Sequence, residues 1–247
     1  MPDRDAFLRA QRKVLGITKP RLGIGTLGEK SIHAILKNYY EPDEDHQEIP
    51  IENYVADIYK DGKIIEIQTR QLNKLREKLK TFLPLYQVTV VHPVISEKSL
   101  IFLDGETGLY SKMRKSPKKE NAYSAFEELY KIKMFLKDPN LRIKLAVLIV
   151  EEYRLVNFGD WNRDRESSTF DRIPTAFVEE VEINCLKDYM QFVPSELEGA
   201  FTSKQFAKAA HINIELAQTV LNILYHVGTV TRVGKIGNQY QYEVLDI

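Results

Sequence analysis

The chain has 247 residues, 43% of them hydrophobic and 28% charged, which is the composition of a globular protein with one large or two ordinary domains. Its 35 basic and 35 acidic residues give zero formal net charge, which argues against nonspecific coating of nucleic acid but leaves room for a local basic surface. The single Cys185 excludes an internal disulfide. No signal-peptide core and no apolar run near the roughly 20 residues of a membrane span are present, so we expect a cytoplasmic protein without membrane contact.

The N-terminal part of the chain predicts two helices. Asp5 to Leu15 repeats apolar residues at helical spacing, and Gly16 is expected to end the helix. A second helix is expected over 28–36, with Glu29 in its first turn and His33 one turn later on the same face. For His33, a partly buried core position and a place beside a metal ion are both open.

The stretch 53–69 predicts a β-hairpin. Two β-rich runs flank Asp61-Gly62, a pair that favours a type I′ turn because both central residues need positive φ. Counting outward from this loop, Asp57 faces Glu66 across the two strands. Opposed carboxylates repel unless a cation such as Mg²⁺ or Mn²⁺ lies between them. A metal site and a solvent-exposed sheet surface with two acids are both compatible with this pattern.

A further helix and strand complete this region. Arg70 to Leu83 repeats apolar residues at helical spacing, and Val88 to Val91 is a short apolar strand. The order is therefore a helix with Glu29, a strand with Asp57, a strand with Glu66, a helix and a strand.

This order resembles the PD-(D/E)xK nuclease superfamily, whose core is α-β-β-β-α-β, over about the first hundred residues. The resemblance implies four catalytic residues: Glu29, Asp57, Glu66 and Gln68. It also implies that Mg²⁺ or Mn²⁺ is held by Asp57, Glu66 and the backbone carbonyl of Ile67, while Glu29 acts through a second metal ion or a bound water.

Two positions depart from the family pattern. Gln68 stands where the family usually has lysine, and glutamine can donate and accept hydrogen bonds but carries no charge. Ala56 occupies the place of the usual proline before the aspartate. The first departure keeps a non-catalytic protein with the same fold as an alternative.

Basic residues suggest where nucleic acid could lie. They occur at the start of the helix from Arg70, in the loop around Ser116-Pro117, and beside aromatic residues in 161–172. The candidate DNA contacts from these segments are Arg70, Lys74, Lys112, Arg114, Lys115, Arg163 and Arg165. Solvated surface charges and, for 161–172, an ordered linker are the alternatives.

The C-terminal stretch has a different character. Thr202 and Gln205 form a capping box, Asn213 caps a second helix over 214–226, and two strands follow Gly228. Helix-turn-helix followed by a β-hairpin resembles a winged helix-turn-helix domain. The resemblance implies DNA contacts by Gln218, Asn222, Arg232 and Lys235. The second helix carries no Lys or Arg, so protein docking or dimerisation is equally open.

The combined prediction is an α/β protein with a restriction-endonuclease-like α-β-β-β-α-β core, additional helices and a C-terminal winged helix. The expected domains are a nuclease-like domain over 1–155, a linker with a connecting helix over 156–194, and a winged helix over 195–247. The expected function is Mg²⁺- or Mn²⁺-dependent DNA endonuclease activity, with a homodimer or a protein partner joined through the winged helix. The alternative is a non-catalytic DNA-binding or regulatory protein, or an assembly subunit of a defence or mobile-element system, that retains a nuclease fold.

Overall fold

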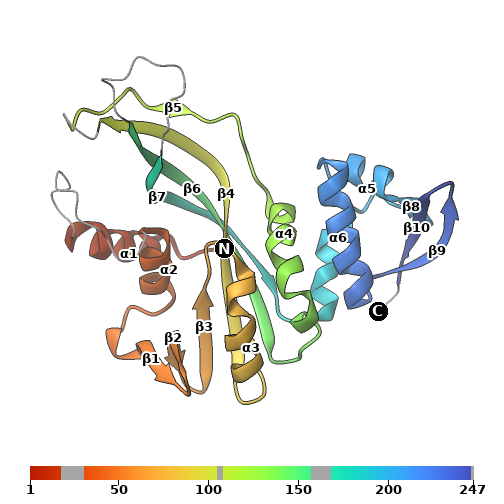
Figure 1. The fold of residues 1–247 in the computed structure, drawn as a ribbon, viewed down its shortest axis with the longest axis horizontal. Coiled ribbons are helices and arrows are strands. Elements are labelled where there is room, and N and C mark those ends of the chain that lie inside the picture. Colours follow the sequence, from red (N-terminus) through yellow and green to blue (C-terminus); the bar gives the residue numbers. More distant parts are fainter. Residues whose placement is uncertain (18–30, 105–107, 157–167, 246–247) are drawn as a thin grey trace. The chain divides into compact units, whose positions relative to one another are not determined.

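The computed structural model describes residues 1–17, 31–104, 108–156 and 168–245 (Figure 1). The chain divides into two compact units, each assembled from three segments. The first unit contains Met1–Tyr59, Pro93–Asn121 and Ala146–Glu180. The second unit contains Lys60–His92, Ala122–Leu145 and Val181–Ile247. The predicted domain boundaries near 155 and 195 stay a prediction.

The strands β1 to β7 form a seven-stranded mixed sheet in the order β1-β2-β3-β4-β6-β7, with β5 paired to β4. Their bounds are β1 Gln47–Ile51, β2 Tyr54–Lys60, β3 Lys63–Ile67, β4 Gln87–Asp104, β5 Arg114–Lys115, β6 Leu141–Val156 and β7 Ser168–Ile183. β1 pairs antiparallel with β2, whereas β3 pairs parallel with β4. The predicted α/β class is confirmed at this level.

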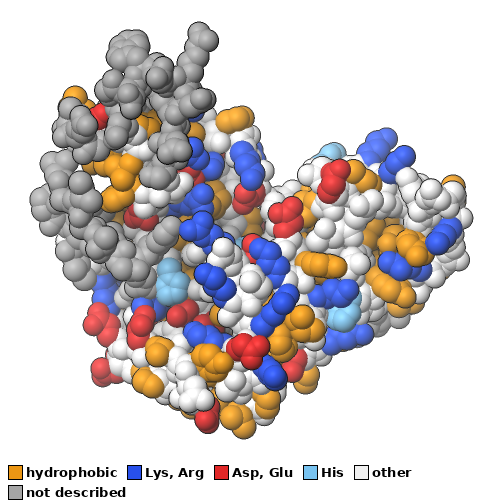
Figure 2. Space-filling model, in the orientation of Figure 1, with side chains coloured by type: hydrophobic (Ala, Val, Ile, Leu, Met, Phe, Trp, Pro, Cys, Tyr) orange, Lys and Arg blue, Asp and Glu red, His pale blue; other side chains and the backbone are white. Residues whose placement is uncertain are grey.

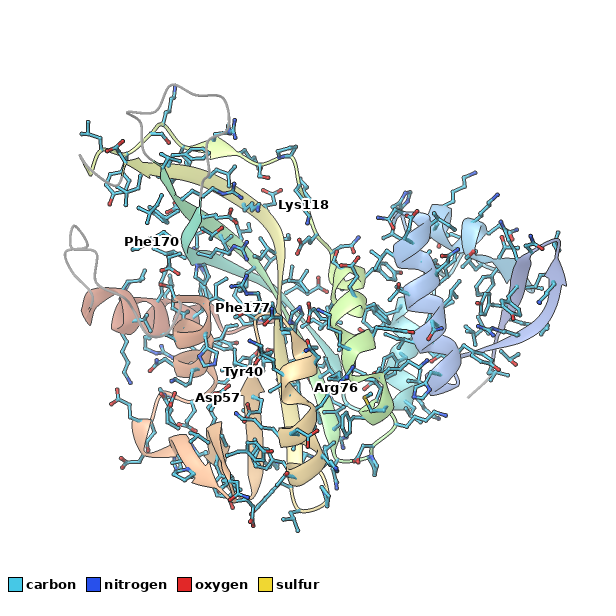
Figure 3. The ribbon with its side chains drawn as sticks, in the orientation of Figure 1. Tyr40, Asp57, Arg76, Lys118, Phe170 and Phe177 are labelled. Carbon is cyan, nitrogen blue, oxygen red and sulfur yellow. The ribbon has the colours of Figure 1, made fainter. Side chains whose placement is uncertain are left out.

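Two helices, α1 (Arg4–Ile17) and α2 (Ser31–Tyr40), belong to the first unit (Figure 1). Phe7 of α1 contacts Phe177 of β7 with ring centroids 5.9 Å apart, and Figure 3 labels Phe177 on its strand. Asp171 of β7 accepts hydrogen bonds from the backbone N–H and the hydroxyl of Ser31, at the first turn of α2. The helical spacing seen in the sequence is thus explained by packing against a distant strand.

The second unit contains short helices where the sequence predicts long ones. The predicted helix over 70–83 is a 3₁₀ turn, Leu72–Leu75, followed by α3 (Arg76–Phe82). Residues 122–136, whose apolar residues also recur at helical spacing, form 3₁₀ turns around α4 (Phe126–Leu129), with non-helical dihedrals at Ile132. Leu72 and Ile132 are buried although neither lies in an α-helix, so tertiary packing rather than regular helix formation covers these side chains.

The C-terminal elements of the second unit agree closely with the sequence signals. They are β8 (Phe201–Thr202), α5 (Ser203–Ala209), α6 (Ile214–Val227), β9 (Val230–Ile236) and β10 (Gln239–Val244), and the strands pair in the order β8-β10-β9. The capping box of Thr202 and Gln205 and the Asn213 cap are both confirmed. Gly228 has φ of 90°, as expected for a glycine that ends a helix.

Three observations differ from the sequence expectations or extend them. α1 continues through Gly16 to Ile17, and β4 extends beyond the expected strand over Val88–Val91, through Pro93 to Asp104. β7 occupies 168–183, inside the predicted connecting segment.

No helix among the described residues is both long enough and apolar enough to cross a membrane.

Candidate metal centre and nucleic-acid contacts

The hairpin loop has the geometry that its sequence predicts. β2 ends at Lys60 and β3 begins at Lys63, so Asp61 and Gly62 are the whole loop. Their φ values are 49° and 73°, and a type I′ turn requires positive φ at both positions. The two-residue loop is confirmed, and the opposition of Asp57 to Glu66 remains a prediction from counting.

Asp57 lies on β2 in the first unit, where Figure 3 labels it, and is half-buried. Its Oδ2 lies 3.2 Å from Nε2 of His33 on α2. An imidazole N–H donated to a carboxylate fixes the orientation of both side chains. His33 is therefore partly buried and also lies beside a predicted metal ligand. A partly buried position and a place near the predicted metal site are thus compatible for this residue.

Glu66 lies on β3 in the second unit and is 1% exposed. Lys78 of α3 donates a hydrogen bond to its Oε2 over 2.8 Å. A buried carboxylate needs such a partner because removal from water strongly disfavours an unpaired charge. Lys78 was not predicted as a site residue, since only the packing of α3 against the sheet brings a residue 12 positions away to Glu66.

Gln68 and Ile67 follow Glu66 directly. Ile67 is buried and pairs with Val91 of β4. The Gln68 side chain donates a hydrogen bond to the carbonyl of Arg70 over 2.5 Å, and the Gln68 carbonyl lies 2.7 Å from Nδ1 of the buried His92. Gln68 is thus anchored in the turn that leaves β3.

The donor chemistry of this hairpin suits a hard cation, because carboxylates are the side chains that Mg²⁺ and Mn²⁺ prefer. Among the described residues, however, no three His, Cys, Asp or Glu residues gather closely enough to hold a metal ion. Glu29, the third predicted acid, lies outside the described residues.

The predicted DNA contacts occupy different surroundings. Arg70, Lys74 and Lys112 are exposed, whereas Arg163 and Arg165 lie outside the described residues. Arg114 is exposed and its guanidinium carbon lies 5.6 Å from the centre of the Phe102 ring. Lys115 forms an ion pair with Glu97 at 2.7 Å, which neutralises part of the basic loop.

The four C-terminal candidates also differ from one another. Gln218 is exposed on α6. Asn222 accepts a hydrogen bond from Lys133 over 2.7 Å, so its side-chain carbonyl already has a partner within the second unit. Arg232 lies over the rings of three tyrosines, and Lys235 lies over the ring of Tyr240.

Comparison with known proteins concerns the segment that contains the hairpin. Residues 30–184, more than half of the chain, match the family described as "Domain of unknown function (DUF8091)". The chain belongs to this family. It is also 31% identical over 150 residues to an "Uncharacterized protein" of Treponema pallidum (strain Nichols). That alignment covers 60% of this chain and 59% of the relative, so the chain spans less than two thirds of the relative's length. No solved structure matches the chain significantly.

The DUF8091 segment contains a second charged cluster that sequence reasoning missed. Glu152 of β6 is fully buried, and Lys98, Arg154 and Arg172 donate hydrogen bonds to it over 3.0, 2.7 and 2.9 Å. Burial alone raises the pKa of the Glu152 carboxyl, but these three cations outweigh burial and lower the pKa to about 2. The sequence signal for this cluster was the spacing of Glu152 and Arg154, which places both side chains on one face of a strand. Nothing in the sequence indicated that Lys98 of β4 and Arg172 of β7 would join them.

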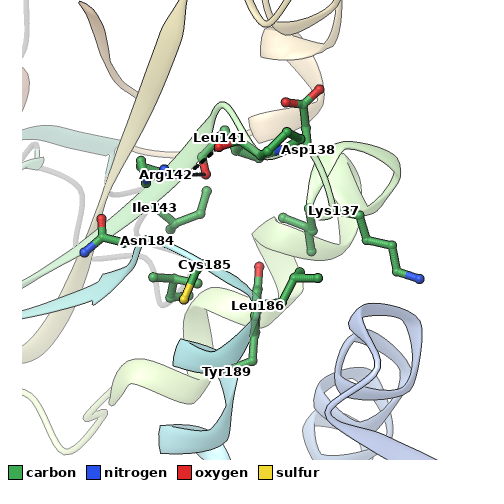
Figure 4. Close-up of a pocket in the computed structure, with 12 residues that line it drawn as sticks. Lys137, Asp138, Leu141, Arg142, Ile143, Asn184, Cys185, Leu186 and Tyr189 are labelled. Carbon is green, nitrogen blue, oxygen red and sulfur yellow. Dashed lines mark hydrogen bonds between the residues drawn. The ribbon is translucent and has the colours of Figure 1, made fainter. Parts of the chain in front are cut away.

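A cavity of about 270 Å³ lies in the second unit (Figure 4). Its walls are largely apolar, with Leu141, Ile143 and Tyr189 among them. Arg142 donates hydrogen bonds to the carbonyls of Pro139 and Leu141, so its guanidinium already supports the loop. The cavity is slightly smaller than ordinary ligand pockets, which start near 300 Å³.

Proposed function

We propose that this DUF8091 protein is a metal-dependent nuclease that hydrolyses phosphodiester bonds of DNA. The observation that carries the proposal is the succession α2, β1, β2, β3, α3, β4, with Asp57 on β2 and Glu66 on β3 on either side of a two-residue loop. This succession supports a restriction-endonuclease-like core of the type that the sequence resembles. The order of the elements is observed. The register of β2 against β3 is inferred by counting residues outward from the Asp61-Gly62 loop.

In this proposal Asp57, Glu66 and the carbonyl of Ile67 hold the ion, and Glu29 acts through a second ion or a bound water. A bound Mg²⁺ or Mn²⁺ would supply an activated water and charge stabilisation at the phosphate. Asp57 is oriented for this task by His33, because the 3.2 Å contact restricts its carboxylate.

Lys78 supplies the cation that is missing at position 68. Lysine in the family motif provides positive charge near the attacking water, which Gln68 lacks. Lys78 brings an ammonium group within 2.8 Å of Glu66 from α3. We therefore assign charge stabilisation to Lys78 and positioning of the polypeptide after β3 to Gln68.

The C-terminal elements support a winged helix-turn-helix that recruits DNA or a protein. Two capped helices, α5 and α6, precede the β9–β10 hairpin, which is the order of that domain type. Exposed Gln218 remains the best placed of the predicted base contacts on α6. The paired Asn222 weakens the case for DNA reading by this helix.

A second candidate function is a non-catalytic regulatory or assembly protein with a nuclease fold. The hydrogen bond from the Gln68 side chain to the Arg70 carbonyl favours it, because a side chain used in a turn is less free to position water. The retained acids Asp57 and Glu66 favour catalysis.

The deciding experiment incubates the full chain with plasmid DNA and with branched DNA in Mg²⁺ or Mn²⁺. Nicking or cleavage that chelator abolishes and that Asp57→Ala and Glu66→Gln remove is the expected result. Asp61→Asn, in the loop of the same hairpin, is the matched control and is expected to retain activity. Equal nicking by wild type and Asp57→Ala would identify a contaminant and exclude this function for the hairpin.

A further inference from the structure

The β9–β10 hairpin carries an unusual grouping of side chains on one face. A β-bulge shifts the register so that Gln241 pairs with Gly234 while Tyr242 pairs with Arg232, which leaves Val233 as the extra residue. The shift brings Arg232 and Lys235, three positions apart, onto the face of Tyr240 and Tyr242. Without the bulge, alternation along β9 would direct the two cations to opposite faces.

Tyrosines surround the Arg232 guanidinium. Its central carbon lies 3.9 Å from the ring centre of Tyr240, 4.5 Å from that of Tyr225 on α6, and 5.7 Å from that of Tyr242. We call Tyr225, Arg232, Lys235, Tyr240 and Tyr242 the tyrosine–arginine face. Such contacts hold a guanidinium plane in one orientation, so little side-chain entropy is lost when a ligand binds it.

The charge of this face is not neutralised within the described part of the chain. Neither Arg232 nor Lys235 forms an ion pair with a described carboxylate, and Nε of Arg232 is buried without a hydrogen-bond partner there. An oriented guanidinium without a carboxylate suits a bidentate anionic group, because its planar donors match two oxygens.

The surroundings favour a protein ligand. Val233 is 48% exposed, Ile236 is 61% exposed, and hydrophobic side chains lie beside Lys and Arg side chains over the C-terminal strands in Figure 2. β9 is the last strand in the order β8-β10-β9, so one of its edges has no neighbouring strand among the described residues. A free edge, exposed aliphatic residues and an arginine held by tyrosines are features of peptide addition and of interface hot spots.

Nucleic acid fits this face less well. The ring of Tyr240 already contacts both cations, which leaves less aromatic surface for stacking of bases. α6 contributes Glu215 and no Lys or Arg, so few positive charges are available for successive phosphates.

We propose that the tyrosine–arginine face binds an extended acidic segment of a partner protein, which pairs with the free edge of β9 and places a carboxylate on Arg232. Backbone hydrogen bonds to β9 give affinity, and aliphatic side chains of the segment cover Val233 and Ile236. The carboxylate gives selectivity, since an uncharged segment leaves the guanidinium without its partner. The site is independent of metal and of the hairpin acids.

The test measures binding of short labelled peptides to the full chain by fluorescence anisotropy in chelator. The probes are a peptide of alternating valine and glutamate, the same peptide with serine or lysine in place of glutamate, and an oligothymidylate strand. The expected order is glutamate peptide tightest, serine peptide weaker, and lysine peptide and oligothymidylate without saturable binding. Backbone amide resonances of β9 are expected to shift with the glutamate peptide.

Variants separate a specific site from general attraction. Arg232→Gln is expected to weaken binding of the glutamate peptide by about tenfold or more, and Arg232→Lys, which keeps the charge, by an intermediate factor. Lys204→Gln, an exposed cation on α5, is the matched control and is expected to bind normally. Equal affinity for the glutamate and serine peptides, or tighter binding of oligothymidylate through Arg232, would overturn the proposal. Because chelator is present, neither result depends on the nuclease assignment.

Discussion

Glu152 illustrates how a single residue can make stability depend on pH. Its folded pKa of about 2 lies below the ordinary value of 4.5, so the folded state favours the charged form. A depressed carboxyl pKa contributes stability that is fully present above the ordinary pKa. That contribution is lost as pH falls from about 4.5 toward 2.

We therefore expect Glu152→Gln to lower the free energy of unfolding by about 3 kcal/mol at neutral pH, because Lys98, Arg154 and Arg172 then face a neutral group. The difference from wild type should shrink as pH falls through 4, since wild type then loses the same charge. Urea unfolding at pH 7 and near pH 3 measures both quantities. The matched control is Glu97→Gln, which removes a partly exposed carboxylate paired with the exposed Lys115 and Lys119, and no measurable change is expected. A pH-independent loss in Glu152→Gln would attribute the effect to packing.

At the same scale, Lys78 and Gln68 can be separated by kinetics. If Lys78 provides the missing charge beside Glu66, Lys78→Gln should lower turnover by about a hundredfold, the usual effect of removing one electrostatic stabiliser. Gln68→Ala should lower turnover less and leave metal affinity intact, because the described hydrogen bond of its side chain goes to the Arg70 carbonyl. Gln68→Lys should retain activity. Metal affinity and turnover are measured separately for each variant, and a loss of metal binding in Gln68→Ala alone would make Gln68 a structural support for the ligands.

At the scale of the element, two glycines isolate the effect of backbone conformation. A Cβ at Gly62 in the hairpin loop or at Gly16 in α1 would have no described heavy atom within 4 Å, so substitution by alanine changes no packing. Gly62 has φ of 73°, which alanine adopts only with strain, whereas Gly16 lies in a regular helix. We expect Gly62→Ala to destabilise by about 1 kcal/mol and Gly16→Ala to stabilise by about 0.5–1 kcal/mol.

Thermal and urea unfolding of the two variants measure these changes. Each variant is the control for the other, because the chemical change is identical and only the backbone conformation differs. A stabilised Gly62→Ala would show that the loop is not the type I′ turn on which the register of the hairpin depends.

At the scale of the whole molecule, a bound ion should couple the hairpin to global stability. In chelator, Asp57→Asn should leave the free energy of unfolding unchanged or raise it by about 0.2–1 kcal/mol, since the counted register opposes two carboxylates. In metal at a hundredfold excess over the dissociation constant, wild type gains about 2.7 kcal/mol and the variant largely does not. The order of the two melting temperatures should therefore reverse when metal is added.

Calorimetry of both proteins in chelator and in Mg²⁺ or Mn²⁺ provides the measurement. Asp61→Asn, which keeps both predicted ligands, should respond to metal as wild type does. Equal destabilisation of Asp57→Asn in both conditions would mean that the Asp57–His33 contact is structural and that no ion binds there.

Local chemistry was sufficient for the parts of this protein that depend on neighbouring residues. Asp61-Gly62 predicted its own loop because few residues tolerate positive φ, and Thr202 with Gln205 predicted a helix start because their side chains satisfy backbone groups within three positions. The mixed helix and strand content was predicted from the local spacing of apolar residues, which also depends only on neighbouring positions.

Contacts between distant segments decided the rest. Several side-chain contacts form only when separate elements pack, so residue spacing along the chain could not predict them. They are the contacts of Glu66 with Lys78, of Glu152 with Lys98 and Arg172, and of Asn222 with Lys133. The predicted helix over 70–83 and the helical apolar repeat over 122–136 are divided into short segments because burial of their apolar residues outweighs intrinsic helix propensity. β7 formed in a segment without a clear strand pattern because an adjacent strand in the sheet satisfies its backbone hydrogen bonds, a condition that only the tertiary structure supplies.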